Sequence, residues 1–305
     1  MKLTFIKLHI AILFAGLGSI LGKLITLNEG IIVWWRMLFA LVLFFIFLSI
    51  TKANIKISMK SFFPIAFSGA LLGLHWVFFF GSIKASNISI GVVCFALVGF
   101  FTAILEPILL KRRFIYKEFI YSLIVLCGIL LIFSFDTRYR TGIIIGIISS
   151  VLYSVASVLT KKNSELCLPP IMLMYQMLGG VIVLTCLMPI YLYLYPVTTI
   201  IPGIRDFLYL IILSFFCTIV LQLFNIQVLK KISAFTVNLS YNLDPIYSII
   251  AAILFFNEAR ELNFSFYIGV TLLFVSVLLQ AWNTIRAKSG NIEVSKKEAN
   301  EILIQ

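Results

Sequence analysis

One carboxylate and one proline stand side by side in a stretch that otherwise reads as a membrane helix. Asp244 is followed at once by Pro245 in the run SYNLDPIYSIIAAIL. At about 100° per residue, Ser240, Tyr241, Asp244 and Ser248 fall on one helical face. A lipid-facing charge in hydrocarbon costs from about 2.5 to about 10 kcal/mol or more, so this polar face is expected to line a bundle interior or a wet cavity.

The proline predicts a break in the same helix. Pro245 cannot donate a backbone hydrogen bond, which frees a carbonyl group about one turn earlier, near Tyr241. In lipid that carbonyl must be satisfied by protein or water. Asp244 lies about 16 Å from the inner end of its span, near the middle of a hydrocarbon core about 30 Å thick. Two interpretations stay open: the carboxylate binds a solute, or it only ties a kinked helix to its neighbour.

A second group of polar residues is predicted at a similar depth. His75 and Trp76 lie about 20 Å from the inner end of the third span, and Gln222 is equally deep in the eighth, with Asn225 one turn further along. These side chains could hydrogen-bond a polar solute beside an apolar wall of Trp76 and residues 78–80. A membrane histidine can equally join two helices. The candidate solute-binding residues are His75, Trp76, Gln222, Asn225, Tyr241 and Asp244.

Four further polar residues are candidates for a gate or vestibule. Arg36, about 8 Å inside the outer end of the second span, either snorkels to the interface or attracts an anionic group such as a carboxylate. Gln176 occupies the mirrored place in the seventh span. Glu106 lies about 8 Å from a basic helix end and is expected to pair with Arg113, two turns on. Lys23 is expected to pair at an outer gate.

Membrane helices must position all of these side chains. The chain has 305 residues, 62% hydrophobic and 12% charged, with a mean hydropathy of +1.11, far from a soluble domain. Apolar stretches of about 20 residues, the length of a transmembrane helix, number ten. They are 8–26, 31–50, 62–82, 88–109, 117–135, 142–160, 171–193, 207–228, 233–256 and 264–284. The first also resembles a signal peptide, but its counterpart in the second half favours a retained span.

Charge and cysteine usage limit the partners. Of the 24 lysines and arginines, seventeen lie in the termini and the loops on one side and six in the loops on the other, with Arg36 inside a span. The positive-inside rule therefore predicts that both termini are cytoplasmic. The net charge of +12 follows from this topology, and no nucleic-acid partner is expected. The five cysteines lack metal-ligand spacing and no Walker motif occurs, so no metal or other cofactor is expected.

The two halves of the chain resemble each other in the same order. The pairs are SILGK (19–23) with SVLTK (157–161), IIVWWRM (31–37) with IMLMYQM (171–177), and GLHWVFFFGSIKAS (73–86) with VLQLFNIQVLKKIS (220–233). Five spans in each half is an odd number, so the halves cross the membrane in opposite directions. We predict an all-α integral membrane protein of two inverted-topology five-helix repeats, 1–137 and 138–285, and a polar cytoplasmic tail, 286–305.

Several motifs resemble the drug/metabolite transporter superfamily, specifically its EamA-type members. They are GSILGK, WWRM, IKASNISIG and KKISAFTVNLSYNLDPIYSIIAAILFFNE, and the resemblance covers about residues 8–284. Gly99 stands where the family often has proline, Lys111 to Arg113 where it often has glutamate, and Ala15-Gly16 where Trp-Gly is common. The resemblance implies small organic metabolites, for instance amino acids, with export as the more usual direction.

The favoured hypothesis is a secondary transporter of a small-molecule solute, working by alternating access in the lipid bilayer of the cytoplasmic membrane. Protons are a candidate coupling ion, because Asp244 or His75 could change protonation during the cycle. An integral-membrane enzyme acting on a lipid-linked substrate would need paired carboxylates or a nucleophile with its base, which the sequence lacks. A passive channel is a third alternative. The solute and the oligomeric state stay open.

Overall fold

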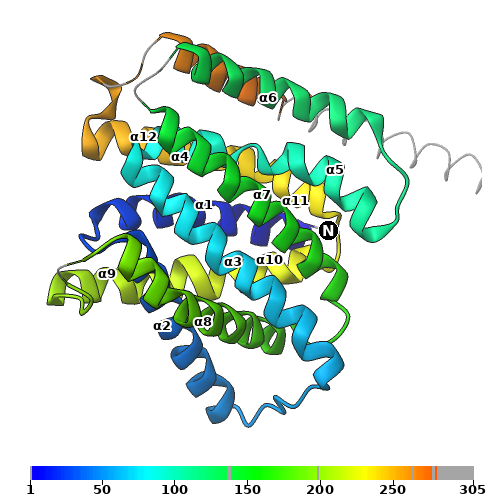
Figure 1. Cartoon of the computed structure of the whole chain (residues 1–305). Coiled ribbons are helices and arrows are strands. Elements are labelled where there is room, and N and C mark those ends of the chain that lie inside the picture. Colours follow the sequence, from blue (N-terminus) through cyan, green and yellow to red (C-terminus); the bar gives the residue numbers. More distant parts are fainter. Residues whose placement is uncertain are drawn as a thin grey trace, which may run out of the picture.

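The fold is a bundle of helices, seen in a computed structural model that describes residues 2–135, 139–197, 199–260, 262, 264–276 and 279 (Figure 1). Within these residues, eight segments are long and apolar enough to cross a membrane. They are Leu3–Leu24, Glu29–Ile50, Met59–Ala85, Ile88–Leu110, Arg140–Asn163, Pro169–Leu194, Ile204–Leu229 and Ala234–Phe256. Two shorter apolar helices, Ser122–Leu131 and Phe264–Ser276, overlap the other two predicted spans, so the count of ten stays a prediction. The predicted tail, 286–305, lies outside the described residues.

Six of the helices are continuous. They are α1 (Lys2–Leu24), α2 (Glu29–Ile50), α3 (Met59–Ala85), α6 (Tyr116–Phe135), α7 (Arg140–Asn163) and α8 (Pro169–Leu194). α3 packs along both α7 and α8, and Gly69 and Gly179 let α3 and α8 approach so closely that a Cβ on either would collide with the facing backbone. Figure 1 shows α6 at the upper edge beside the orange Phe264–Ser276 helix.

Three spans are interrupted in their interior. The first consists of α4 (Ile88–Phe95) and α5 (Val98–Leu110). The second consists of α9 (Ile204–Ser214), the π-helix η1 (Phe215–Val220) and α10 (Leu221–Leu229). The third consists of α11 (Ala234–Ser240), the 3-10 turn η2 (Tyr241–Leu243) and α12 (Asp244–Phe256). A short 3-10 turn, η3 (Glu258–Arg260), follows. Pro245 is the second residue of α12, where its missing N–H needs no helical partner.

The α4–α5 and α11–α12 spans share the same local structure. Asn87 and Ser233 cap their starts, each accepting a backbone N–H three residues on, at 2.9 and 3.1 Å. Lys111 and Asn257 end them in the left-handed conformation, with φ of 51° and 58°. The first span breaks without a proline and the second just before one, so both halves of the chain build an interrupted helix at the same place.

Each of these two spans also carries or precedes a carboxylate that caps the start of the other. Glu106 in α5 accepts the N–H groups of the first two residues of α11, at 3.2 and 2.7 Å. Glu258, which follows α12, accepts the N–H groups of the first two residues of α4, both at 3.0 Å, and the Ser89 hydroxyl at 2.8 Å. Negative charge at a helix start is favourable because it satisfies unpaired N–H groups and the helix dipole.

The ion pair expected between Glu106 and Arg113 is wrong. Glu106 pairs instead with Arg112, at 3.2 Å. The reason is that α5 ends at Leu110 and the chain turns at Lys111, so helical spacing does not extend to the basic residues beyond it. The capping of α11 by the same carboxylate was not predicted.

Candidate functional site

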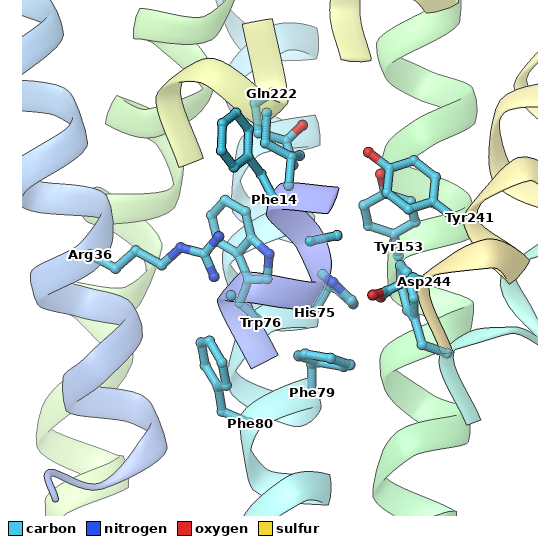
Figure 2. A pocket seen from close by; sticks show the side chains of 14 residues that line it. Phe14, Arg36, His75, Trp76, Phe79, Phe80, Tyr153, Gln222, Tyr241 and Asp244 are labelled. Atoms are coloured by element: carbon cyan, nitrogen blue, oxygen red, sulfur yellow. The ribbon is translucent and has the colours of Figure 1, made fainter. Parts of the chain in front are cut away.

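A small buried cavity of about 40 Å³ lies where the interrupted spans meet α1, α2, α3 and α7 (Figure 2). Aromatic side chains make up much of its lining. Five polar or charged lining residues were candidates from the sequence: Arg36, His75, Gln222, Tyr241 and Asp244. The lining residues are Phe14, Ala15, Gly18, Arg36, His75, Trp76, Phe79, Phe80, Phe95, Tyr153, Leu221, Gln222, Tyr241 and Asp244. The volume is room for a few water molecules, since one water needs about 10–15 Å³ measured in this way.

Asp244, the first residue of α12, is fixed in the cavity wall by contacts with α1. Its Oδ1 accepts a hydrogen bond from the Ser248 hydroxyl at 2.8 Å, and that hydroxyl accepts one from Ser19 at 3.2 Å. The close approach of α1 depends on Gly16, where a Cβ would lie 3.1 Å from both the carboxylate and the Ser248 hydroxyl. Asp244 is 1% exposed and forms no ion pair with the described residues.

Arg36 reaches the cavity from the opposite side, as Figure 2 shows. Its Nε donates to the Thr218 hydroxyl at 2.6 Å, and a second N–H group donates to the Cys217 carbonyl, both in the π-helix η1. The guanidinium lies 3.9 Å from the centre of the Trp76 ring and is 3% exposed. The snorkelling alternative is therefore wrong: the polar groups of η1 hold the side chain inward. Among the described residues no carboxylate pairs with it.

His75 both lines the cavity and joins two helices. Its Nδ1 lies 2.8 Å from the Ser149 hydroxyl and 3.0 Å from the Ser149 carbonyl oxygen in α7. Its ring stands 4.8 Å from that of Tyr153 and 5.2 Å from that of Phe95. The helix-joining interpretation of this histidine is observed, because its contact with α7 fixes the ring in the cavity wall, while the solute-binding interpretation stays a prediction.

The Gln222 amide and the Tyr153 and Tyr241 phenols complete the polar part of the wall. Asn225 does not line the cavity but supports two of these residues. Its Nδ2 donates to the Tyr153 hydroxyl at 3.0 Å and approaches Gln222 Oε1 at 3.4 Å. The buried Tyr241 hydroxyl has no hydrogen-bond partner of good geometry among the described residues. A buried hydroxyl left unpaired costs about 1–3 kcal/mol, which a solute or water in the cavity would relieve.

Tyr153 is the polar residue of the cavity lining that was not predicted from the sequence. It belongs to a polar stripe of Ser150, Tyr153, Ser154 and Ser157 on α7, at helical spacing in SSVLYSVAS. That stripe was the signal that could have found it. Phe14 and Phe95 were also missed, but nothing distinguishes them from the many other phenylalanines in apolar spans.

Three of the four gate candidates lie away from the cavity. Gln176 is buried between α3 and α7, donating to Ser68 at 3.0 Å and to Thr160 at 2.9 Å. Glu106 is the helix-capping carboxylate already described. Lys23 forms no ion pair with the described residues, so its expected pairing is not found. Near the same end of α1, Thr26 instead donates to the Asp206 carboxylate at 2.6 Å.

A bundle of apolar helices around a central cavity of aromatic and charged side chains defines the class: a multi-pass membrane protein with polar groups in its interior. The model of the EamA-like transporter family matches residues 3–134 and 140–282, and the chain belongs to that family. The resemblance drawn from the sequence motifs is confirmed, and the two matches correspond to two repeats.

A solved structure titled "Crystal structure of protein" is similar to this chain, with 15% sequence identity and a TM-score of 0.66. The similarity covers 94% of this chain and 99% of that one, so the two share the whole fold. No curated protein matches the sequence.

Proposed function

We propose that the protein is a secondary transporter that moves a small organic metabolite, such as an amino acid, across the cytoplasmic membrane by alternating access. Membership of the EamA-like transporter family supports a membrane transporter. The observation that carries the solute class is the pair of opposite, unpaired charges in one cavity, Arg36 on one side and Asp244 on the other. Export is the direction we propose.

The two charges suit a zwitterion. A buried charge without a partner is costly, and a solute with a carboxylate for Arg36 and an ammonium group for Asp244 would neutralise both. His75, Gln222 and Tyr241 would hydrogen-bond the solute, with Asn225 acting through its contacts with Gln222 and Tyr153. Trp76 and the surrounding phenylalanines would form the apolar wall.

The small size of the cavity supports a mechanism in which the protein changes conformation. Pockets that hold small molecules measure about 300–1,000 Å³, so a cavity of about 40 Å³ must widen to admit an organic solute. We propose that ten spans in two inverted repeats, with both termini cytoplasmic, supply two related conformations open to opposite sides. The interrupted α4–α5 and α11–α12 spans are the elements that would bend.

The gate residues act at the ends of these spans in this proposal. Glu106 caps α11 at one end of the bundle and Glu258 caps α4 at the other, so each caps an interrupted span that contributes to the cavity wall. Gln176 supports the α3–α8 contact near one gate, and Lys23 lies near the other. Asp244 is the proposed site of proton coupling, because it is the one carboxylate among the described residues that lines the cavity.

A binding screen tests the solute class. Purified protein would be heated with amino acids, nucleosides, sugars or small amines, and the unfolding temperature recorded. We expect saturable stabilisation by amino acids in the wild type and in Glu165→Gln, a control that neutralises a carboxylate that is 74% exposed and does not line the cavity. The Asp244→Asn variant is expected to lose it. Equal stabilisation of Asp244→Asn would remove this carboxylate from the site.

A further inference from the structure

A second cavity, of about 330 Å³, lies at the ends of α1 and α10 and is separate from the central one. Its polar lining consists of three lysines, a hydroxyl and an amide: Lys7 and Thr4 from α1, Gln227 from α10, and Lys230 and Lys231 from just beyond α10. We propose that this cavity, here called the lysine cavity, binds the phosphate group of an anionic phospholipid. The proposal does not depend on the transported solute.

The charge of the lysine cavity is uncompensated. Among the residues that the structure describes, no acidic side chain lines it, and the one carboxylate that pairs with any of the three lysines is Glu165, 3.5 Å from Lys230 and 74% exposed. A pair this exposed contributes little, because water screens it. Three ammonium groups around one space repel each other, and an anion placed between them removes that repulsion.

The geometry holds one of these ammonium groups in place. The Lys7 Nζ donates to the Gln227 side chain and lies 5.6 Å from the centre of the Phe224 ring. Its position is thus set by α10, although the residue belongs to α1. Lysine is a common phosphate ligand, acting as a compact point charge, and the buried Thr4 beside it carries a hydroxyl group that can donate to a phosphate oxygen.

The surroundings of the lysine cavity favour a lipid as the source of the phosphate. Leu3 lines the cavity and is 62% exposed, and Ile6 and Leu13 on the same helix are 53% and 49% exposed. In a membrane these apolar side chains would contact acyl chains while the headgroup meets the lysines. The predicted topology puts this end of α1 at the cytoplasmic leaflet, where basic pockets between helices bind anionic headgroups.

A bound headgroup would connect two helices of the central site. α1 contributes Phe14 and Gly18 to the central cavity and α10 contributes Gln222. A phosphate held by Lys7 on one helix and Lys230 beyond the other would resist their separation at this end. The lipid would therefore favour conformations that are closed on the side of the lysine cavity.

Native mass spectrometry of the full chain tests the proposal with phosphatidylglycerol as the anionic probe and phosphatidylcholine as the zwitterionic one. We expect phosphatidylglycerol to bind more tightly, and the triple variant Lys7→Gln, Lys230→Gln, Lys231→Gln to bind it at least about tenfold more weakly. The matched control is Lys52→Gln, Lys56→Gln, Lys60→Gln, which removes the same charge elsewhere on the predicted cytoplasmic side. It is expected to change binding less than about twofold.

Two further measurements distinguish lipid binding from misfolding and from binding of soluble phosphate. A triple Lys→Arg variant at positions 7, 230 and 231 retains the charge and is expected to keep the lipid, which separates binding from misfolding. Inorganic phosphate and glycerol phosphate, added as competitors, test a soluble source. Four results would each overturn the proposal. Lipid binding could be lost equally in both glutamine triples, retained in the lysine-cavity glutamine triple, or lost in the arginine triple. Soluble phosphate could also displace the lipid at equal concentration.

Discussion

The guanidinium carbon of Arg36 lies 3.9 Å from the centre of the Trp76 ring, and the residue is buried inside the protein. Cation–π contact of this kind stabilises a desolvated cation by about 2 kcal/mol or more. That falls short of the cost of a buried charge, so the guanidinium remains available to an anionic group. The stacked pair therefore fixes where the carboxylate of a solute would bind.

Replacing Arg36 should change which solutes bind. In Arg36→Gln we expect the affinity for an amino acid to fall by about tenfold to a hundredfold, because a charge-assisted contact of about 1.5–3 kcal/mol is lost. The amine that lacks the carboxylate should bind the variant and the wild type alike. Competition binding with both compounds measures this. An equal loss for acid and amine would show that Arg36 only holds the fold.

The affinity for an amino acid should depend more on the aromatic face of Trp76 than on the volume of its side chain. Trp76→Phe keeps an aromatic face under the guanidinium, whereas Trp76→Leu keeps apolar volume without it. We expect the leucine variant to bind an amino acid about two- to thirtyfold more weakly than the phenylalanine variant, from about 0.5–2 kcal/mol of cation–π energy. Titration of both variants tests this, and indistinguishable affinities would contradict it.

The approach of α1 to Asp244 should depend on Gly16. A Cβ at this position lies 3.1 Å from the carboxylate and from the Ser248 hydroxyl, so Gly16→Ala requires α1 or these two groups to shift by a few tenths of an ångström. We expect a loss of about 1–3 kcal/mol in stability and a reduced affinity for the solute. The control is Gly203→Ala, because nothing lies within 4 Å of the added methyl group. Thermal unfolding that is unchanged in both variants would argue against the close contact.

The two reciprocal caps should both stabilise the fold. Glu106→Gln and Glu258→Gln each replace a charge that accepts two backbone N–H groups, and we expect each to cost about 0.5–2 kcal/mol. Unfolding measurements in detergent check this against Glu165→Gln, whose exposed carboxylate should contribute much less. If Glu106→Gln matched that control, its capping contacts would have no energetic role.

Labelling of Cys167 tests the predicted topology and a pH dependence together. This thiol lies in the loop between α7 and α8, where burial raises its pKa and nearby Lys230 opposes that shift. The raised pKa keeps the thiol protonated at neutral pH, so alkylation should accelerate as pH rises through and above the ordinary range near 8.5. In a variant whose only cysteine is Cys167, an impermeant maleimide should label inverted vesicles and not intact cells. The opposite pattern would reverse the predicted orientation.

Eight of the ten predicted spans match long apolar helices, because hydropathy over 20 residues reflects a strong physical demand. The sequence also identified His75, Trp76, Gln222, Tyr241 and Asp244, which the fold brings to one cavity, because polar groups deep in a span need polar surroundings. The direction of the Arg36 side chain could not be predicted, since depth alone does not reveal the polar groups of η1 that hold it. The capping role of Glu106 was hidden for a similar reason: it depends on a contact between residues far apart in the chain.

The most direct test of the central claim is solute flux in proteoliposomes. A radiolabelled amino acid chosen by the binding screen would be followed by counterflow, with wild type, Asp244→Asn and the Glu165→Gln control reconstituted at equal density. We predict saturable counterflow in the wild type and the control, and its loss in Asp244→Asn. Undiminished, saturable counterflow in Asp244→Asn would contradict the account, because it would mean that the carboxylate facing Arg36 has no part in transport.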